Sequence, residues 1–440
     1  MRITYSLLLL CFVSAILSCK QPIEANNKTI IAGKEGMLLD SMITAYLIEL
    51  RNSTDNNAGL AIAVTNGDEI IYARNFGYEN IELGIEADFN TLFHIASLSK
   101  PFTAVAALKL IQQGKLNLED KIVNLIPEFK MKGNEFEKIT VKHLLTHSSG
   151  IPRHVSANDW LNPKPLDANL EFAQQFELDF EPNSQFSYSN SAFDILGIVI
   201  SRASGMSFTN YVRKHVLEPC GMTNSIYDKP LAILPKKWAV PYSYGLETQE
   251  WTPYPHADNY APSSGLQTTL LDMCKWGIMH SKKGLNVLNS NHFELLTMPH
   301  YDTPWGEKIG LSWFLQSYLD RPIIMHSGQD TGFESIQYIY PESEISIVVM
   351  ANRDFSRTGR IINAISECLF HQTPKLYRIS AIYKFSEAYN QFGIEKAKHI
   401  LEELKKDTSD IYYVNNYDIL TTGAVLENGK SWNEAKLVLE

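Results

Sequence analysis

The segment FHIASLSKPF (residues 93–102) joins a β-like run to an Ala- and Leu-rich stretch that we expect to be helical over residues 101–112. If helical geometry begins at Ser97, then Ser97 and Lys100 lie on neighbouring surface positions, because residues three apart share a helix face. The free N–H groups at a helix N-terminus stabilise negative charge and disfavour a protonated lysine. The pattern, which occurs once in the chain, predicts Ser97 as a nucleophile and Lys100 as its base. The alternative is a helix-capping serine beside a solvated lysine.

A second polar segment, EPNSQFSYSNS (residues 181–191), leads into an apolar run that is expected to be a helix. The Tyr188 phenol can relay a proton, and the Asn190 amide can hydrogen-bond a substrate. Tyr-x-Asn also occurs at residues 78–80 and 413–415. The alternative for Tyr188 is therefore a half-buried packing residue.

A third segment, HSGQDTGF (residues 326–333), follows a short apolar strand. The absence of a side chain at Gly328 lets the backbone of a ligand approach closely. His326 can bind a substrate carboxylate or carbonyl, and the Gln329 backbone N–H can complete an oxyanion hole with that of Ser97. The alternative is a histidine in a polar turn.

The remaining sequence pattern indicates an α+β fold, in which strands at both ends of a domain enclose a mostly helical block at about residues 115–230. Apolar residues at helical spacing predict helices at about 36–52 and 358–370. Two β-rich runs around Asn66-Gly67 predict a hairpin. Further strands are expected at residues 323–325, 336–340 and 345–350.

Together the three motifs resemble those of the penicillin-recognising serine hydrolases, in the branch of class C β-lactamases, DD-peptidases and related esterases. The linking segments LLTHSSGIP (144–152), LEPCGMT (217–223), GLQTT (265–269) and GLSW (310–313) agree with this resemblance, which covers about residues 36–370. It implies a β-lactamase/transpeptidase-like domain over residues 35–372. In this fold an antiparallel sheet is built from the N- and C-terminal segments, helices cover its faces and the middle subdomain is mostly helical.

The resemblance also implies a role for each site residue. Ser97 would form an acyl-enzyme, Lys100 and Tyr188 would share the base and acid roles, and His326 would complete the catalytic set. Four residues would bind the substrate: Asn190, Ser327, Gly328 and Gln329. The split of the base role between Lys100 and Tyr188 stays open at this point.

One departure from the class C pattern concerns charge. Those enzymes have lysine where this chain has His326, and no Lys-Ser-Gly or Lys-Thr-Gly occurs anywhere in the sequence. Histidine is only partly charged at neutral pH, so a free carboxylate should be held less firmly unless a neighbour raises the pKa of His326. His-x-Gly also resembles the third motif of the peptidase and esterase members of the family. This resemblance implies an ester or amide in a small-molecule or peptide substrate, and we expect inefficient β-lactam hydrolysis.

The N-terminus has the layout of a secretory signal peptide over residues 1–18: one basic residue, a short apolar stretch and a small residue. ILSC (residues 16–19) resembles the lipobox of bacterial lipoproteins, which implies a lipid on Cys19 and a polar tether over residues 19–34. We therefore expect an exported lipoprotein of the bacterial cell envelope, held to the membrane through a lipid anchor alone. Plain secretion and a buried N-terminal helix are the alternatives.

Charge and cysteine content exclude several other classes of protein. The net charge of −10 disfavours a nucleic-acid partner, because phosphate binding needs clustered Lys and Arg. The chain has five cysteines, of which the first would leave with the signal peptide and the second would carry lipid, so no disulfide framework is implied. Metal-ligand spacings and phosphate-binding Gly loops are absent, and we expect no metal or cofactor.

Residues 373–440 are expected to form a small helical extension, with helices at 383–406 and 417–440. The second helix has small residues at offsets that resemble a tetratricopeptide repeat, and a plain helical hairpin is the alternative. Such helices are a candidate site for a protein partner. This feature also leaves open a different class of function, a catalytically silent penicillin-binding-like surface protein.

Overall fold

The computed structural model describes residues 24–52, 57–153, 164–227, 238–244, 248–250, 258–354, 356–374, 379–406 and 412–414. The expected signal peptide, the lipid on Cys19 and the helix at 417–440 lie outside these residues and stay predictions. Within the described part of the chain, every helix is too short or too polar to cross a bilayer.

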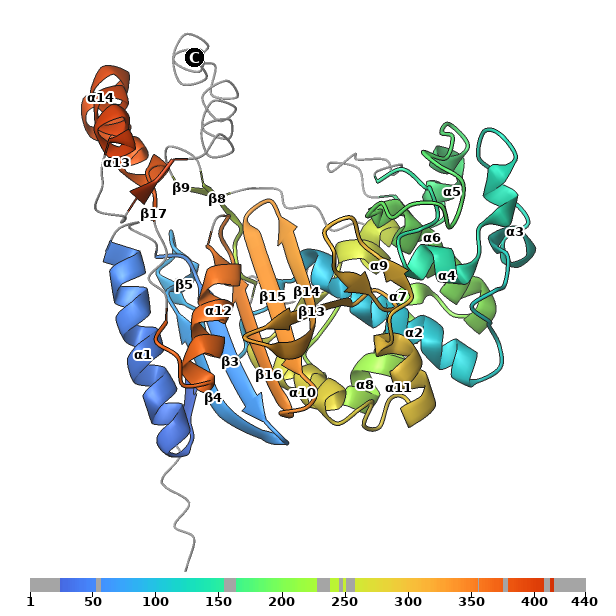
Figure 1. Cartoon of the computed structure of the whole chain (residues 1–440), viewed down its shortest axis with the longest axis horizontal. Coiled ribbons are helices and arrows are strands. Elements are labelled where there is room, and N and C mark those ends of the chain that lie inside the picture. Colours follow the sequence, from blue (N-terminus) through green and yellow to red (C-terminus); the bar gives the residue numbers. More distant parts are fainter. Residues whose placement is uncertain are drawn as a thin grey trace, which may run out of the picture.

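A single antiparallel sheet forms the centre of the fold (Figure 1). Its strands come from both ends of the domain, as the α+β prediction required, and all neighbouring strands are antiparallel. In spatial order the strands are β1 (Glu24–Asn26), β2 (Thr29–Ile31), β4 (Glu69–Phe76), β3 (Leu60–Asn66), β16 (Ile345–Ala351), β15 (Phe333–Tyr340), β14 (Arg321–Asp330), β13 (Phe314–Tyr318), β12 (Lys308–Ile309) and β11 (Tyr301–Asp302).

Both faces of the sheet are buried, which explains why its central strands are almost continuously apolar. In β3, Leu60, Ile62 and Val64 belong to one hydrophobic cluster, whereas Ala61 and Ala63 belong to the other. This alternation follows from the strand geometry, since successive side chains point to opposite faces. The small alanines lie on the face against which the larger helical block packs.

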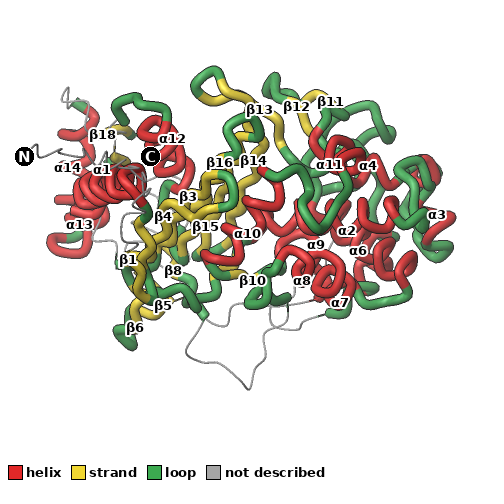
Figure 2. The backbone as a smooth tube through the Cα atoms, turned by 90° about the horizontal axis from the view of Figure 1, so that it is seen from below, coloured by secondary structure: helices red, strands yellow, loops and turns green. Residues whose placement is uncertain are grey.

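Helices cover both faces of the sheet. Helices α1 (Gly33–Asn52) and α12 (Thr358–Leu369) pack on one face, and α10 (Leu270–Ser281) packs on the other against β3 and β16. Figure 2 shows the strands as a layer between these two sets of helices. The expected helices at 36–52 and 358–370 and the hairpin β3–β4 are therefore confirmed.

The helical block lies beyond α10, as the sequence predicted for the middle of the domain (Figure 1). The ring of Phe102 stacks on that of Trp276, with centroids 3.7 Å apart, and this contact joins the block to α10. The described elements of the helical block are η1 (Ala96–Ser99), α2 (Lys100–Gln112), α3 (Ile122–Leu125), η2 (Glu135–Lys138), α4 (Val141–Leu145), α5 (Ala168–Ala173), α6 (Asn190–Ser204), α7 (Phe208–Val212), η3 (Arg213–Leu217), α8 (Glu218–Cys220), η4 (Asp258–Tyr260), α9 (Ala261–Ser264) and α11 (Ser290–Thr297).

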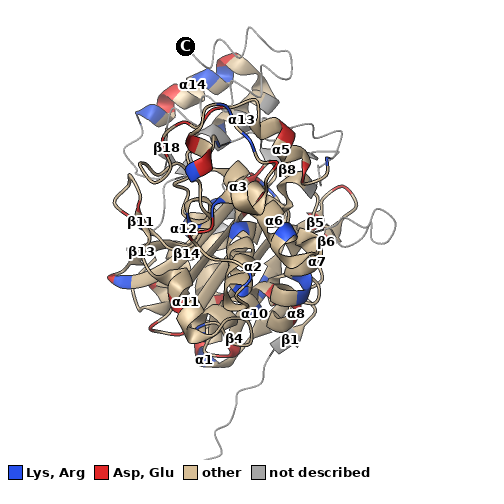
Figure 3. Cartoon of the chain, turned by 90° about the vertical axis from the view of Figure 1, so that its right-hand side faces the viewer, with Lys and Arg blue, Asp and Glu red and all other residues tan. Residues whose placement is uncertain are grey.

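Short ladders complete the described secondary structure. They are β5 (Tyr78–Asn80) with β6 (Ile85–Glu86), β7 (Phe93–His94) with β10 (Gln267–Thr268), β8 (Tyr242–Tyr244) with β9 (Thr248–Glu250), and β17 (Ile379–Ser380) with β18 (Tyr412–Tyr413). Charged residues of both signs are interspersed over the ribbon rather than segregated by sign (Figure 3).

Two sequence expectations were wrong in detail. The single helix expected at 383–406 is a pair of helices, α13 (Ile382–Phe392) and α14 (Ile394–Lys405), because Gly393 adopts a φ of +81° that no right-handed helix accommodates. The strand expected at residues 323–325 is longer, because β14 continues through the third motif to Asp330. The repeat interpretation of the extension stays a prediction, since its second half lies outside the described residues.

The contact between α10 and the sheet depends on the absence of a side chain at Gly277, where a Cβ atom would overlap Ser346 of β16. We expect Gly277→Ala to lower the free energy of unfolding by about 1–3 kcal/mol, the usual cost of overpacking. The measurement is urea unfolding. Gly359→Ala is the matched control, because nothing lies within 4 Å of its added Cβ. Equal stability of the two variants would contradict the packing argument.

Candidate active site

Ser97 lies in a tight turn between β7 and α2. The preceding residue, Ala96, has a φ of +47°, a conformation that residues with a Cβ rarely adopt. The Leu98 N–H donates to the Ile95 carbonyl at 3.1 Å and closes the turn. Ala96, Leu98 and Ser99 are buried, whereas Ser97 is partly exposed. The turn therefore presents the Ser97 hydroxyl and buries its neighbours.

The Lys100 amine lies beside this hydroxyl and is fully buried. Its Nζ lies 3.0 Å from Ser97 Oγ, 2.7 Å from Asn190 Oδ1 and 2.9 Å from the Ser263 carbonyl oxygen. The latter two oxygens can only accept hydrogen bonds. A neutral amine that donates its two N–H groups to them keeps its lone pair for the proton of Ser97. This is the arrangement that a general base requires.

Burial also gives Lys100 a suitable protonation state. Loss of hydration lowers the pKa of Lys100 to about 7, which the nearby Arg153 charge reinforces. The carboxylates of Asp194 and Asp330 act in the opposite direction. Asp194 is itself buried, and burial raises its pKa. A large fraction of the amine is thus unprotonated near neutral pH.

Tyr188 is placed against the same amine. Lys100 Nζ lies 4.8 Å from the centre of the Tyr188 ring. Burial raises the pKa of Tyr188, and a hydrogen bond to Ser97 lowers it by less. The side chain is therefore a neutral phenol that can donate a proton. The structure brings Tyr188 and Asn190, which begins α6, to the nucleophile as the sequence predicted.

His326 lies on β14 and is buried as a neutral imidazole. Its Nδ1 is 2.7 Å from the Ser327 carbonyl oxygen, which can only accept, so Nδ1 carries the proton. Within the described residues its Nε2 has no hydrogen-bond partner. Burial, helped by the Lys100 charge, lowers the pKa of His326 to about 3. Among the described residues, no neighbouring carboxylate raises the pKa of His326, so the imidazole is not a cation that could bind a carboxylate.

The rest of the third motif lies along the edge of β14. Pairing of β14 with β13 ends at Met325, so among the described strands β14 is paired beyond this point only with β15. The side chains of Ser327 and Gln329 are exposed. At Gly328 a Cβ atom would overlap the Ile95 carbonyl oxygen and approach the Leu98 nitrogen. The glycine thus lets the strand lie directly on the nucleophile's turn.

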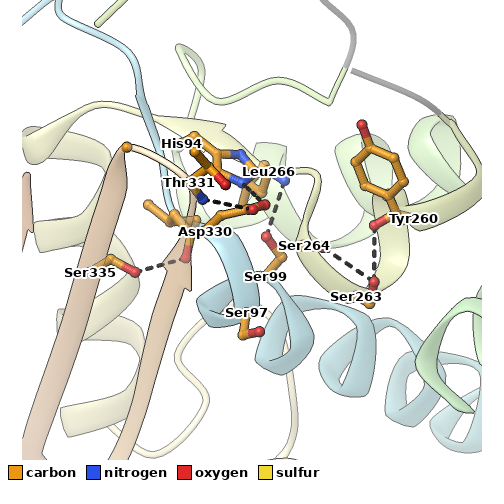
Figure 4. A network of polar contacts seen from close by, with 12 residues as sticks. His94, Ser97, Ser99, Tyr260, Ser263, Ser264, Leu266, Asp330, Thr331 and Ser335 are labelled. Carbon is orange, nitrogen blue, oxygen red and sulfur yellow. Dashed lines mark hydrogen bonds and ion pairs between the residues drawn. The ribbon is translucent and has the colours of Figure 1, made fainter. Parts of the chain in front are cut away.

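A buried polar network fixes this close approach (Figure 4). The Gln267 amide donates to His94 Nδ1 at 2.9 Å, so the other ring nitrogen carries the proton and donates to Asp330 at 3.2 Å. Ser335 of β15 donates to the Ile95 carbonyl at 2.7 Å. Ser99 accepts from the Leu266 N–H at 3.1 Å. The nucleophile's turn is therefore bonded to β15 through Ile95 and to the segment before β10 through Ser99.

Sequence reasoning missed two buried groups that support the site. The His147 ring packs 4.3 Å from that of Tyr188, and its Nδ1 accepts from the Ser189 N–H at 3.1 Å. Asp194 accepts from the Ser263 N–H at 3.2 Å, next to the carbonyl that binds Lys100. A signal for Asp194 existed, because a charged residue in the apolar run of residues 192–200 needs an electrostatic reason.

Comparison with known proteins identifies relatives of this chain. A model of the Beta-lactamase family matches residues 44–366. Protein flp of Staphylococcus aureus (strain MW2) is 27% identical over 342 residues, which make up 76% of this chain and 67% of that protein. Penicillin-binding protein 4* of Bacillus subtilis (strain 168) is 28% identical over 347 residues, or 71% of this chain and 72% of that protein.

A solved structure extends the similarity to three dimensions. The octameric penicillin-binding protein homologue from Pyrococcus abyssi matches with a TM-score of 0.68 at 26% sequence identity. The match covers 76% of this chain and 78% of that one.

The Asp194 carboxylate raises the pKa of Lys100, so its removal should make the amine easier to deprotonate. We expect Asp194→Asn to move the acidic limb of the pH dependence of Ser97 acylation to lower pH, by about 1 pH unit. The measurement is the rate of labelling by a fluorophosphonate between pH 5 and pH 9. Asp167→Asn, which changes an exposed carboxylate paired with Arg202, is the control. An unshifted or upward-shifted limb would contradict this role of Asp194.

Proposed function

Since the chain belongs to the Beta-lactamase family, and so to the serine hydrolase superfamily of penicillin-binding-like proteins, we propose that it cleaves an ester or amide through an acyl-enzyme on Ser97. The observation that carries the proposal is the 3.0 Å contact between Lys100 Nζ and Ser97 Oγ. Lys100 has two other acceptors, and its lowered pKa makes the neutral amine available.

The acylation step follows from these protonation states. Lys100 takes the proton of Ser97 as Oγ attacks the carbonyl carbon of the substrate, and the carbonyl oxygen becomes an oxyanion. The Tyr188 phenol donates its proton to the leaving group, and the proton held by Lys100 returns to Tyr188. This order assigns the base role to Lys100, because the raised pKa of Tyr188 makes a phenolate costly.

Hydrolysis of the acyl-enzyme reverses these transfers. A water molecule attacks the acyl carbon and gives up one proton to the base, and the C–O bond to Ser97 breaks as Oγ regains a proton. We propose that the backbone N–H groups of Ser97 and Gln329 stabilise the oxyanion in both steps. The open edge of β14 next to the Ser97 turn supports this assignment.

The neutral state of His326 bears on the substrate class. A buried imidazole with its pKa near 3 is uncharged at physiological pH and offers Nε2 only as a hydrogen-bond acceptor. It therefore suits a neutral N–H or O–H of the substrate better than a carboxylate. This favours esters and peptides over β-lactams, whose recognition in the class C pattern uses a third-motif lysine.

The nucleophile is tested with a fluorophosphonate probe. We expect the protein to be labelled on Ser97, and Ser97→Ala to abolish labelling because no acceptor for the phosphonyl group remains. Intact-protein mass measures the adduct, and Ser317→Ala, which removes an exposed hydroxyl of β13, is the control. Persistent labelling of Ser97→Ala would remove Ser97 as the nucleophile. A wild-type protein that forms no adduct with fluorophosphonate or penicillin would instead favour a ligand-binding protein without catalysis.

The substrate preference is tested by direct comparison. We expect kcat/KM on a small aryl ester such as 4-nitrophenyl acetate to exceed that on the cephalosporin nitrocefin by about tenfold or more, the loss expected when a charge-assisted contact is missing. Initial rates of both substrates on the same preparation provide the measurement. The His326→Lys variant should lower the ratio of kcat/KM on the aryl ester to kcat/KM on nitrocefin. Equal or faster turnover of nitrocefin by the wild-type protein would reverse the proposed preference.

A further inference from the structure

Arg153 lies beside the catalytic groups, although the sequence analysis assigned it no role. Its guanidinium carbon is 5.3 Å from the centre of the Tyr188 ring. Its backbone carbonyl accepts from the N–H groups of Asn190 at 3.1 Å and Ser191 at 3.4 Å, at the start of α6. The main chain of Arg153 is thus bonded to the helix that carries Asn190.

The guanidinium is exposed and is not neutralised by the described residues. In that part of the chain no Asp or Glu forms an ion pair with Arg153. By contrast, Arg74, Arg202 and Arg213 each bond to a carboxylate at 2.6–2.8 Å. Arg153 instead has its guanidinium over the Tyr188 ring of the site. The charge also reaches the site, because Arg153 lowers the pKa of Lys100, His147 and Tyr188.

The other basic groups of the site cannot offer a permanent positive charge to a substrate. Lys100 is buried among Ser97, Asn190 and the Ser263 carbonyl, and it acts as a base only when neutral. His326 is buried, and its Nδ1 proton is committed to the Ser327 carbonyl. The third motif therefore lacks the cation that its lysine provides in class C β-lactamases.

We propose that Arg153 is a specificity-determining residue that binds a free carboxylate of the substrate, at a distance from the scissile carbonyl. The inference rests on the proposed hydrolase function. A guanidinium is planar, always charged and matched to a carboxylate by two parallel N–H···O bonds. The substrate class is then esters or amides that carry a free carboxylate, such as half-esters of dicarboxylic acids or acylated peptides with a free C-terminus. The carboxylate lies at Arg153 instead of at His326.

The test compares two esters that differ only in this group: the mono-4-nitrophenyl ester of glutaric acid and the 4-nitrophenyl ester of glutaramic acid. We expect the wild-type protein to prefer the acid in kcat/KM. Arg153→Met keeps an unbranched side chain and removes the charge, so it should lower the acid-to-amide ratio about tenfold or more, through KM. Arg153→Lys should restore part of the ratio, and added salt should reduce it in the wild-type protein.

The acid-to-amide ratio of kcat/KM separates carboxylate binding by Arg153 from the effect of Arg153 on the pKa of Lys100. Loss of the Arg153 charge also removes an influence that lowers the pKa of Lys100, but this change affects both esters equally and cancels. Arg202→Met, which removes an exposed arginine of α6, is the matched control and should leave the ratio unchanged.

Each outcome distinguishes the two levels of the proposal. A wild-type protein that hydrolyses both esters without preferring the acid would overturn the role of Arg153 and leave the Ser97 hydrolase intact. The same holds if the acid is preferred and Arg153→Met keeps that preference. A protein that hydrolyses neither ester and is not labelled by fluorophosphonate would overturn the hydrolase function, and the proposal for Arg153 with it.

Discussion

The buried amine of Lys100 is the group on which the rest of the site depends. An amine taken out of water is costly unless its hydrogen bonds are replaced, and here the partners come from three separate elements. Ser97 belongs to the turn η1, Asn190 begins α6 and the Ser263 carbonyl lies in α9. Each must be in place for the lysine to be buried at all. The same loss of hydration that makes the position costly lowers the pKa of the amine and makes it a base.

The second constraint is the close approach of the sheet to the nucleophile's turn. Strand β14 can lie on this turn because Gly328 has no side chain, and the bond between His94 and Asp330 holds the two together. The antiparallel sheet supplies the rigid support, since β14 is paired to β15 along residues 324–330. The turn, the strand edge and α6 thus form one unit, although residues from about 93 to 330 contribute to it.

The positive charge in this site is placed differently from the class C pattern. A neutral His326 begins the third motif, and Arg153 places a permanent cation beside the Tyr188 ring. In the proposed arrangement, the contact to a substrate carboxylate lies on the segment that precedes α6 instead of on β14. Lys100 and Tyr188 keep their roles in moving protons, although the Arg153 charge lowers the pKa of both groups.

The sequence alone determined what local spacing can encode. Ser97 and Lys100 are three residues apart, the β3–β4 hairpin has an Asn-Gly turn, and β15 and β16 are apolar runs, so the sequence predicts each of these features. Of β14 it predicts only the apolar part at residues 323–325. The helix break at Gly393 was missed because the residues on both sides of it have helical periodicity. Only the tertiary structure decided that His326 is uncharged and that Asp194, His147 and Arg153 belong to the site. The reason is physical: a pKa depends on burial and on neighbouring charges, and here these neighbours come from distant parts of the chain.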